Sequence, residues 1–152
     1  MGGRKVILAG QSMDHTSLVA QTAVRWFEEV WNQRREATID ELLSSRSVCH
    51  TESGPIVGPE QFRAGMYGPF LSAFPDMKVT VEDVIAEGDR AVVRWSATAT
   101  HTGDGLGILP TGRSVTIRGM TWVTVLEGQL GEGWQYSNLD EVVQALISRS
   151  RP

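Results

Sequence analysis

The spacing of apolar residues near the start of the chain predicts an amphipathic helix over residues 16–32. Apolar side chains recur there every three or four positions, which places them on one helical face. They are Val19, Ala23, Trp26, Phe27, Val30 and Trp31. Thr16 and Ser17 are suitable N-cap residues for this helix. A second, short helix is predicted over residues 38–43, where two acidic residues fall in the first turn and favour the positive end of the helix dipole.

The segment 58–74 predicts a third helix that is weak or interrupted. Pro59 suits the first helical turn, because it has no amide hydrogen to leave unpaired, and Pro75 ends the helix. Two glycines and a proline between residues 65 and 69 lower the stability of its middle. The apolar positions of this helix are Phe62, Met66, Phe70 and Phe74.

After Pro75 the period of alternation changes to two, which is typical of strands with one buried face. Predicted strands cover residues 48–51, 77–82, 91–101, 114–126 and 130–136, and a closing helix covers residues 139–147. A turn-rich loop over residues 102–112 separates two of the strands. Helices followed by a mostly antiparallel sheet predict an α+β domain, in which the curved sheet wraps around the N-terminal helices.

The composition fits one ordinary globular domain. With 152 residues, of which 41% are hydrophobic and 21% charged, the chain can bury a core of its own. We expect residues 14–152 to form a single domain and residues 1–13 to form a flexible arm. The 14 basic and 18 acidic residues give a net charge of -4, which argues against binding to nucleic acid or to an anionic membrane surface.

The residue spacing supports no metal, nucleotide or disulfide site. Cys49 is the only cysteine, so an intrachain disulfide and a cysteine-rich zinc site are both excluded, and we expect a cytoplasmic location. The three histidines are scattered without metal-ligand spacing. The glycines of residues 103–107 do not open a helix after a strand, as a dinucleotide-binding loop does. We therefore expect no metal and no cofactor.

Five short motifs follow one another along the chain. They are Ala73-Phe74-Pro75-Asp76, Glu87-Gly88-Asp89-Arg90, Thr100-His101-Thr102-Gly103, Pro110-Thr111-Gly112-Arg113 and Glu132-Gly133-Trp134. In this order they resemble the SnoaL-like polyketide cyclase family over residues 16–147. The resemblance implies the cone-shaped α+β barrel of the nuclear transport factor 2-like superfamily, with an apolar pocket between sheet and helices. It also implies ring closure of a polyketide by intramolecular aldol chemistry, without metal or organic cofactor.

Asn138 stands where the resemblance places the acid-base Asp of the family, four residues after Trp134. An amide cannot take up a proton near neutral pH, so Asn138 can hold an enol or a water but cannot be the base. Asp140 and His101 are the remaining candidates for moving the proton. A structural alternative stays open, because Asn138 can cap the last helix, with Glu141 completing a capping box, while Asp140 serves only the helix dipole.

The candidate substrate-binding residues are mostly aromatic. Trp134 and Tyr136 share a strand face with Asn138, and that face belongs either to the core or to a pocket wall. His50, on the first strand, is either a pocket residue or an ordinary edge residue, and His101 is either a ligand-facing base or a core histidine. The other candidates are aromatic and thioether side chains, which suit a flat apolar ligand. They are Trp122, Trp95, Met66, Phe70 and Trp31.

These residues lead to the hypothesis of a cofactor-free enzyme that acts on a hydrophobic, polyketide-like or polycyclic small molecule. Its chemistry would be of cyclase, hydroxylase or isomerase type, with Asn138 orienting a carbonyl or enol. Two alternatives stay open, namely a non-catalytic small-molecule binding module on the same fold and a dimerisation domain. The resemblance also implies a homodimer, formed through the sheet face that carries Arg94, Ser96 and Thr98.

Overall fold

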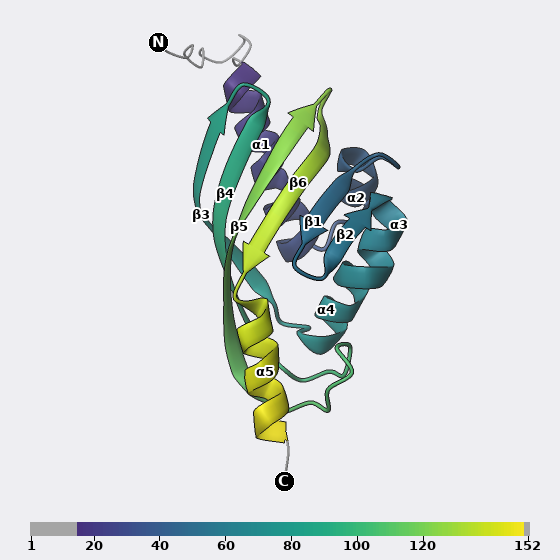
Figure 1. The fold of residues 1–152 in the computed structure, drawn as a ribbon, viewed down its shortest axis with the longest axis vertical. Coiled ribbons are helices and arrows are strands. Elements are labelled where there is room, and N and C mark those ends of the chain that lie inside the picture. The colour runs from purple at the N-terminus through teal and green to yellow at the C-terminus, as the bar shows by residue number, and fades with distance from the viewer. Residues whose placement is uncertain (1–14, 151–152) are drawn as a thin grey trace.

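The computed structural model describes residues 15–150 of the chain. Figure 1 shows a curved six-stranded sheet, with the N-terminal helices on one side of it. The strand order is β2-β1-β6-β5-β4-β3, so β2 and β3 are the two edges and the sheet stays open. The α+β fold expected from the sequence is therefore confirmed, with a curved and unclosed sheet in place of a complete barrel.

The strands are β1 (Val48–Thr51), β2 (Gly54–Val57), β3 (Lys78–Glu87), β4 (Arg90–Thr100), β5 (Ser114–Leu126) and β6 (Gln129–Ser137). The helices are α1 (His15–Arg25), α2 (Glu36–Leu42), α3 (Gly58–Phe62), α4 (Gly68–Ala73) and α5 (Leu139–Ser150). Two π-helical stretches, η1 (Trp26–Asn32) and η2 (Arg63–Tyr67), continue α1 and α3 without a break. The helix predicted over residues 16–32 is thus a single rod made of α1 and η1.

The predicted interruption of the third helix is a π-helical segment, η2. At its end the Gly68 amide donates to the carbonyl of Arg63, one residue further back than in an α-helix. Pro69 follows in the first turn of α4, where its missing amide hydrogen is tolerated. The chain therefore stays helical from α3 to α4, and the weak residues change the hydrogen-bond period without ending the helix.

Strand β2 is not predicted by the sequence pattern. Gly54 and Pro55 are unfavourable in strands, so the sequence pattern does not indicate β2, which pairs with β1 in a short hairpin. Proline is tolerated here because β2 lies at the edge of the sheet, where an amide hydrogen is not needed for pairing. Gly54 has a φ of 117°, a backbone conformation that glycine adopts at low cost as it completes the turn.

Strands β3 to β6 form an antiparallel meander, and β1 runs parallel to β6. Burial alternates along β4, where the buried side chains face the helices, and the same face of β5 buries Ile117, Val123 and Val125. We call this face the inner face and the opposite one the outer face. Helix α1 packs against the inner face at β3 and β4, which buries Val19 and Ala23.

Some expectations concern residues outside the described range or properties of the whole chain. The arm predicted for residues 1–13 lies outside residues 15–150. Within those residues, every helix is too short or too polar to cross a membrane. The same residues bring no three His, Cys, Asp or Glu side chains together as a metal site would.

Candidate functional site

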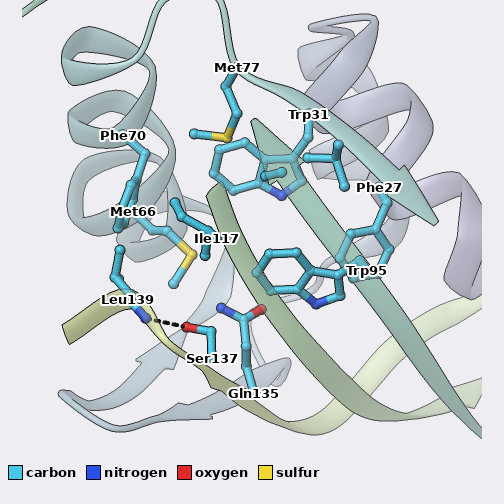
Figure 2. Close-up of a pocket in the computed structure, with 12 residues that line it drawn as sticks. Phe27, Trp31, Met66, Phe70, Met77, Trp95, Ile117, Gln135, Ser137 and Leu139 are labelled. Atoms are coloured by element: carbon cyan, nitrogen blue, oxygen red, sulfur yellow. Dashed lines mark hydrogen bonds between the residues drawn. The ribbon is translucent and has the colours of Figure 1, made fainter. Parts of the chain in front are cut away.

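An apolar pocket of about 70 Å³ lies between the inner face of the sheet and the helices (Figure 2). The helices contribute one wall and strands β3 to β6 the other. Its lining residues are Phe27, Trp31, Met66, Phe70, Met77, Val79, Trp95, Ala97, Ile117, Gln135, Ser137 and Leu139. Four of the candidate substrate-binding residues lie here, namely Trp31, Met66, Phe70 and Trp95. None of the twelve lining residues carries a carboxylate, imidazole or amine, so the wall itself contains no general base.

The indole of Trp95 fits the pocket because a glycine lies opposite it on β5. Trp95 pairs with Gly119, and a Cβ atom built at Gly119 would approach Trp95 Cζ2 to 2.6 Å and the Tyr136 carbonyl oxygen to 2.7 Å. Real Cβ atoms do not come so close to other atoms. Gly119 therefore gives the indole room to lie along the sheet, and Phe27 packs on it from the helix side at a ring-centroid distance of 6.1 Å.

A chain of hydrogen bonds fixes the orientation of the Gln135 amide. The Trp95 indole N–H donates to Thr121 Oγ1 at 3.0 Å, and Thr121 Oγ1 lies 3.2 Å from Gln135 Oε1. An indole can only donate, so the Thr121 oxygen accepts from Trp95 and its own proton is free for the Gln135 carbonyl. Consequently the carbonyl side of the amide is turned toward Thr121, and the amide nitrogen is left for other partners.

The amide nitrogen of Gln135 has no acceptor within residues 15–150. Figure 2 shows this nitrogen on the side of the amide nearer Met66 and Ser137. The Trp31 indole N–H is a second pocket donor without a hydrogen-bond partner in the described part of the chain. The Ser137 hydroxyl oxygen accepts the Leu139 amide at 3.2 Å where α5 begins. The pocket is thus apolar, with two N–H donor groups to offer a ligand.

The Asn138 side chain is bound to the neighbouring strand and not to the pocket. Its Oδ1 accepts the Arg118 backbone amide at 2.8 Å, and the Asn138 backbone N–H donates to the Arg118 carbonyl at 3.1 Å. The Asn138 carbonyl accepts the Val142 amide at 3.1 Å, as an N-cap residue does, but the side chain makes no capping bond. The predicted cap position is therefore present, whereas the predicted capping box with Glu141 is not.

Asp140 and His101 also lie outside the pocket. Asp140 is exposed in the first turn of α5. His101 is fully buried, and its Nδ1 accepts the Thr111 amide at 3.2 Å and lies 3.0 Å from Thr111 Oγ1. Because Nδ1 accepts an N–H bond, the ring proton lies on Nε2, which has no partner in residues 15–150, and the ring packs against Phe74. The structure does not bring Asn138, His101 and Asp140 together around one cavity.

The other predicted ligand contacts, Trp134, Tyr136, Trp122 and His50, lie on the outer face, away from the pocket. Trp122 is 43% exposed and Tyr136 62% exposed, while His50 stacks on Trp134 at a centroid distance of 5.3 Å. His50 also lies 2.7 Å from the Glu132 carboxylate. The sequence pattern groups Trp134 with Tyr136 correctly, but only the packing of the helices decides which face of the strand is inside. The pocket wall on β6 is therefore formed by Gln135, which lies between them, and by Ser137.

Several pocket residues are missing from the sequence-based set. Phe27 and Met77 are predicted as apolar helix and strand positions, and nothing in the pattern separates them from the core. Gln135 and Ser137 are polar residues that alternate with aromatic ones, which is the usual sign of a solvent-facing position. The signal that could have identified them is Gly133, two residues before Gln135 on the same strand face, because a position without a side chain leaves room for a ligand.

Comparison with known proteins agrees with this architecture. A model of the SnoaL-like polyketide cyclase family matches residues 21–146. A candidate SnoaL-like polyketide cyclase from Jannaschia sp. CCS1 is 27% identical with a TM-score of 0.80, and the match covers 94% of this chain and 100% of that one. The candidate polyketide cyclase IdmH from Streptomyces antibioticus is 25% identical with a TM-score of 0.70, covering 86% of this chain and 98% of that one.

A third solved structure shows likeness of fold alone. AclR, a candidate hydroxylase from Streptomyces galilaeus, is 24% identical with a TM-score of 0.74, and the match covers 86% of this chain and 96% of that one. The curated proteins contain no match to this sequence. The family match nevertheless runs from α1 to α5 and includes both walls of the pocket. The chain therefore belongs to the SnoaL-like polyketide cyclase family.

Proposed function

We propose that this chain binds a flat, apolar ketone of polyketide type in the pocket of Figure 2 and promotes the closure of a ring in it. The observation that carries the proposal is the Gln135 amide, whose carbonyl is occupied by Thr121 and whose N–H groups are unpaired beside an apolar hollow. A hydrogen bond is worth about 0.5–1.5 kcal/mol, so a ligand that brings an acceptor oxygen to these half-buried N–H groups is favoured.

The Trp31 indole strengthens this preference. Its N–H is the second unpaired donor of the pocket, and it comes from the helix wall, opposite the strand that carries Gln135. Donors on an apolar wall stabilise negative charge that develops on an oxygen, because no water competes with them. An aromatic ketone is also the shape that the two indoles of Trp31 and Trp95 can hold by stacking.

The ring-closing step needs no base from the pocket wall. An enol carbon of the ligand attacks one of its carbonyl carbons, so one C–C bond forms and the carbonyl becomes a hydroxyl group. The proton that leaves the enol oxygen is the one that the new hydroxyl oxygen gains, directly or through a water molecule. In this step the chain folds the ligand, and Gln135 donates to the oxygen on which negative charge develops.

Binding can be tested with a fluorescent aromatic ketone, a dimethylamino-naphthalene that carries a propionyl group. We expect the wild-type chain to bind it with a blue-shifted emission, and Gln135→Leu to weaken binding by roughly three- to tenfold, the value of one hydrogen bond. The matched control is Tyr136→Leu, one residue further on the outer face, which leaves the affinity unchanged. A Gln135→Leu variant that binds like the wild type would contradict the proposal.

Activity can be tested with a linear aryl triketone that closes a ring by intramolecular aldol addition and then loses water. Mass spectrometry of the product over time should show faster ring closure with the wild-type chain than in buffer. We expect Gln135→Leu to lower the rate about 10²–10³-fold, as loss of an oxyanion donor does elsewhere. Binding of the ketone without any product would favour the alternative of a non-catalytic binding module.

We also propose that the outer face pairs two copies of the chain. A cross-strand row of mostly apolar residues runs over it, formed by His50, Trp134, Trp122, Val92 and Ile85. The next row contains both Arg94 and Asp83, so two copies related by a two-fold axis can place opposite charges together. Sedimentation equilibrium should show a dimer for the wild type and a monomer for Trp122→Glu. A monomeric wild-type chain would contradict this pairing.

A further inference from the structure

A second apolar cavity, of about 60 Å³, lies beside the pocket of Figure 2. It is enclosed by η1, α3, the β1–β2 hairpin and the inner face of β5 and β6, and its apolar wall includes Trp26, Leu43, Ile56, Phe62 and Leu130. The two side-chain hydroxyl groups on its wall are already bonded, since Ser47 donates to the Leu130 carbonyl at 2.6 Å and Thr121 accepts from Trp95. This cavity therefore offers a ligand apolar contacts only.

Met66 lines both cavities, so its side chain separates them. Figure 2 shows the thioether reaching from the helix into the first pocket. Met66 lies in the π-helical stretch η2 between Gly65 and Gly68, and a π-helical turn is a common feature of functional sites. Because the methionine side chain is unbranched and has three rotatable bonds, it can change rotamer without moving the backbone.

Each cavity alone is small for a ligand. A pocket of about 70 Å³ is smaller than typical ligand pockets of roughly 300–1,000 Å³, and the second cavity is smaller still. Rotation of Met66 would join them into one elongated space. Its polar end would be at Gln135 and its apolar end at Cys49, on β1.

We propose that the second cavity is a tail subsite, which receives an alkyl chain of the ligand after Met66 rotates. This proposal rests on the proposed function, because the flat ketone head occupies the first pocket. The ligand is thus an aromatic or polycyclic ketone with a saturated tail, and Met66 is the residue that controls the length of tail accepted.

The test uses dimethylamino-naphthalene ketones that carry a propionyl, hexanoyl or decanoyl chain. We expect affinity to rise by about fourfold per methylene until the tail fills the cavity, since each buried methylene contributes that much. Met66→Ala should bind the hexanoyl probe more tightly than the wild type does, whereas Met66→Leu, of similar size but branched, should bind it more weakly. Because Met66 also lines the first pocket, each chain is judged by the ratio of its affinities for the hexanoyl and propionyl probes, which should rise in Met66→Ala and fall in Met66→Leu.

Cys49 provides an independent readout because it lines the second cavity and is the only cysteine of the chain. The rate at which methyl methanethiosulfonate modifies it is measured with each probe at the same saturation. The hexanoyl probe should slow this reaction, and the propionyl probe should not. Cys49→Leu fills the second cavity, so the affinity should no longer rise with the length of the acyl chain. If Cys49→Leu fails to fold, Ile56→Phe, on the edge hairpin, fills the same cavity and should have the same effect.

The outcomes separate the two proposals. Binding of the propionyl probe that depends on Gln135, with neither gain from a longer chain nor protection of Cys49, overturns the tail subsite and leaves the proposed function standing. Chain-dependent binding with protection of Cys49, but no effect of Gln135→Leu, supports the tail subsite and contradicts the role of Gln135. Failure of all three probes to bind overturns both proposals.

Discussion

The two faces of β6 differ in a way that determines where a ligand can bind. The inner face carries the small or polar residues Gly133, Gln135 and Ser137 and, beyond an irregularity in the β5–β6 register, Leu130, whereas the outer face carries Trp134 and Tyr136. The helices pack over the inner face, so bulk on that side of the strand would fill the space that forms the two cavities. The difference teaches that the aromatic residues of β6 do not mark the site. The site lies where the strand lacks bulk and the facing helices do not replace it.

The same contrast appears on β5. Inside, Gly119 leaves room for the Trp95 indole, and Thr121 holds the Gln135 amide in place. Outside, Met120 and Trp122 are 53% and 43% exposed. Gly119 and Thr121 thus help to position other side chains, whereas Met120 and Trp122 are exposed and can contact a second copy of the chain. The comparison predicts that equivalent substitutions on the two faces have unequal effects.

The largest difference in the loss of stability should be between substitutions of two aromatic residues of the sheet. Trp95 is 8% exposed and Tyr136 is 62% exposed. We expect Trp95→Ala to lower the free energy of unfolding by about 3–5 kcal/mol, because it leaves a cavity and removes the donor to Thr121. Tyr136→Ala should change it by less than about 0.5 kcal/mol. Urea denaturation measures both values, and equal losses would refute the contrast.

The next effect concerns Cys49 and His50, which are consecutive residues on opposite faces. Burial raises the pKa of the Cys49 thiol to about 11, so at pH 8 its reaction with a small thiol reagent should be about a hundredfold slower than that of an exposed thiol. The rate should rise tenfold per pH unit toward that pKa.

This raised pKa also gives a stability effect with a definite sign. The folded state holds the thiol proton more tightly than the unfolded state, whose cysteine pKa is about 9.0. The protonated Cys49 thiol therefore adds its full stabilisation of the folded state below about pH 9. This stabilisation is lost as the pH rises toward about 11. Cys49→Ala should remove this part of the alkaline loss of stability in denaturation curves, while His50→Ala should leave it in place.

A smaller effect is expected from neighbouring residues of β5. Gly119→Ala places a Cβ atom against Trp95 and a backbone carbonyl, so we expect a loss of about 1–3 kcal/mol in unfolding free energy and weaker binding of the propionyl probe. Met120→Ala, on the outer face, should stay within about 0.5 kcal/mol of the wild type. A Gly119→Ala chain with wild-type stability would show that Trp95 is not held by this contact.

The smallest effect should come from Asn138→Asp, which introduces the acid-base residue that the resemblance to the family implies at this position. The new carboxylate would still accept the Arg118 amide, but it cannot donate to the Thr116 carbonyl, at present 3.5 Å from Asn138 Nδ2. Because the side chain lies outside the pocket, ring closure of the triketone should be unchanged. A marked gain in rate would place this position back in the reaction.

The pattern of the chain was sufficient for most of the elements, but not for strand β2 or for the site. Period two along residues 91–101 correctly indicates the buried face of β4, because that strand is central and its two faces differ strongly in polarity. The same rule groups Trp134 with Tyr136 but cannot orient β6, where both faces contain residues that suit either side. Strand β2 is concealed by Gly54 and Pro55, which are tolerated only because its free edge needs no partner.

The sequence by itself determined the α+β class, the long helix over α1 and η1, and the family. These follow from local periodicity and from ordered motifs, which involve residues close together in the chain. The tertiary structure alone decided that Gln135 lies in the pocket, and that Asn138 is bound to β5 while His101 lies in the core. The physical reason is that each of these positions depends on contacts between strands and helices distant in sequence, where a shift of one residue exchanges the inner and outer faces.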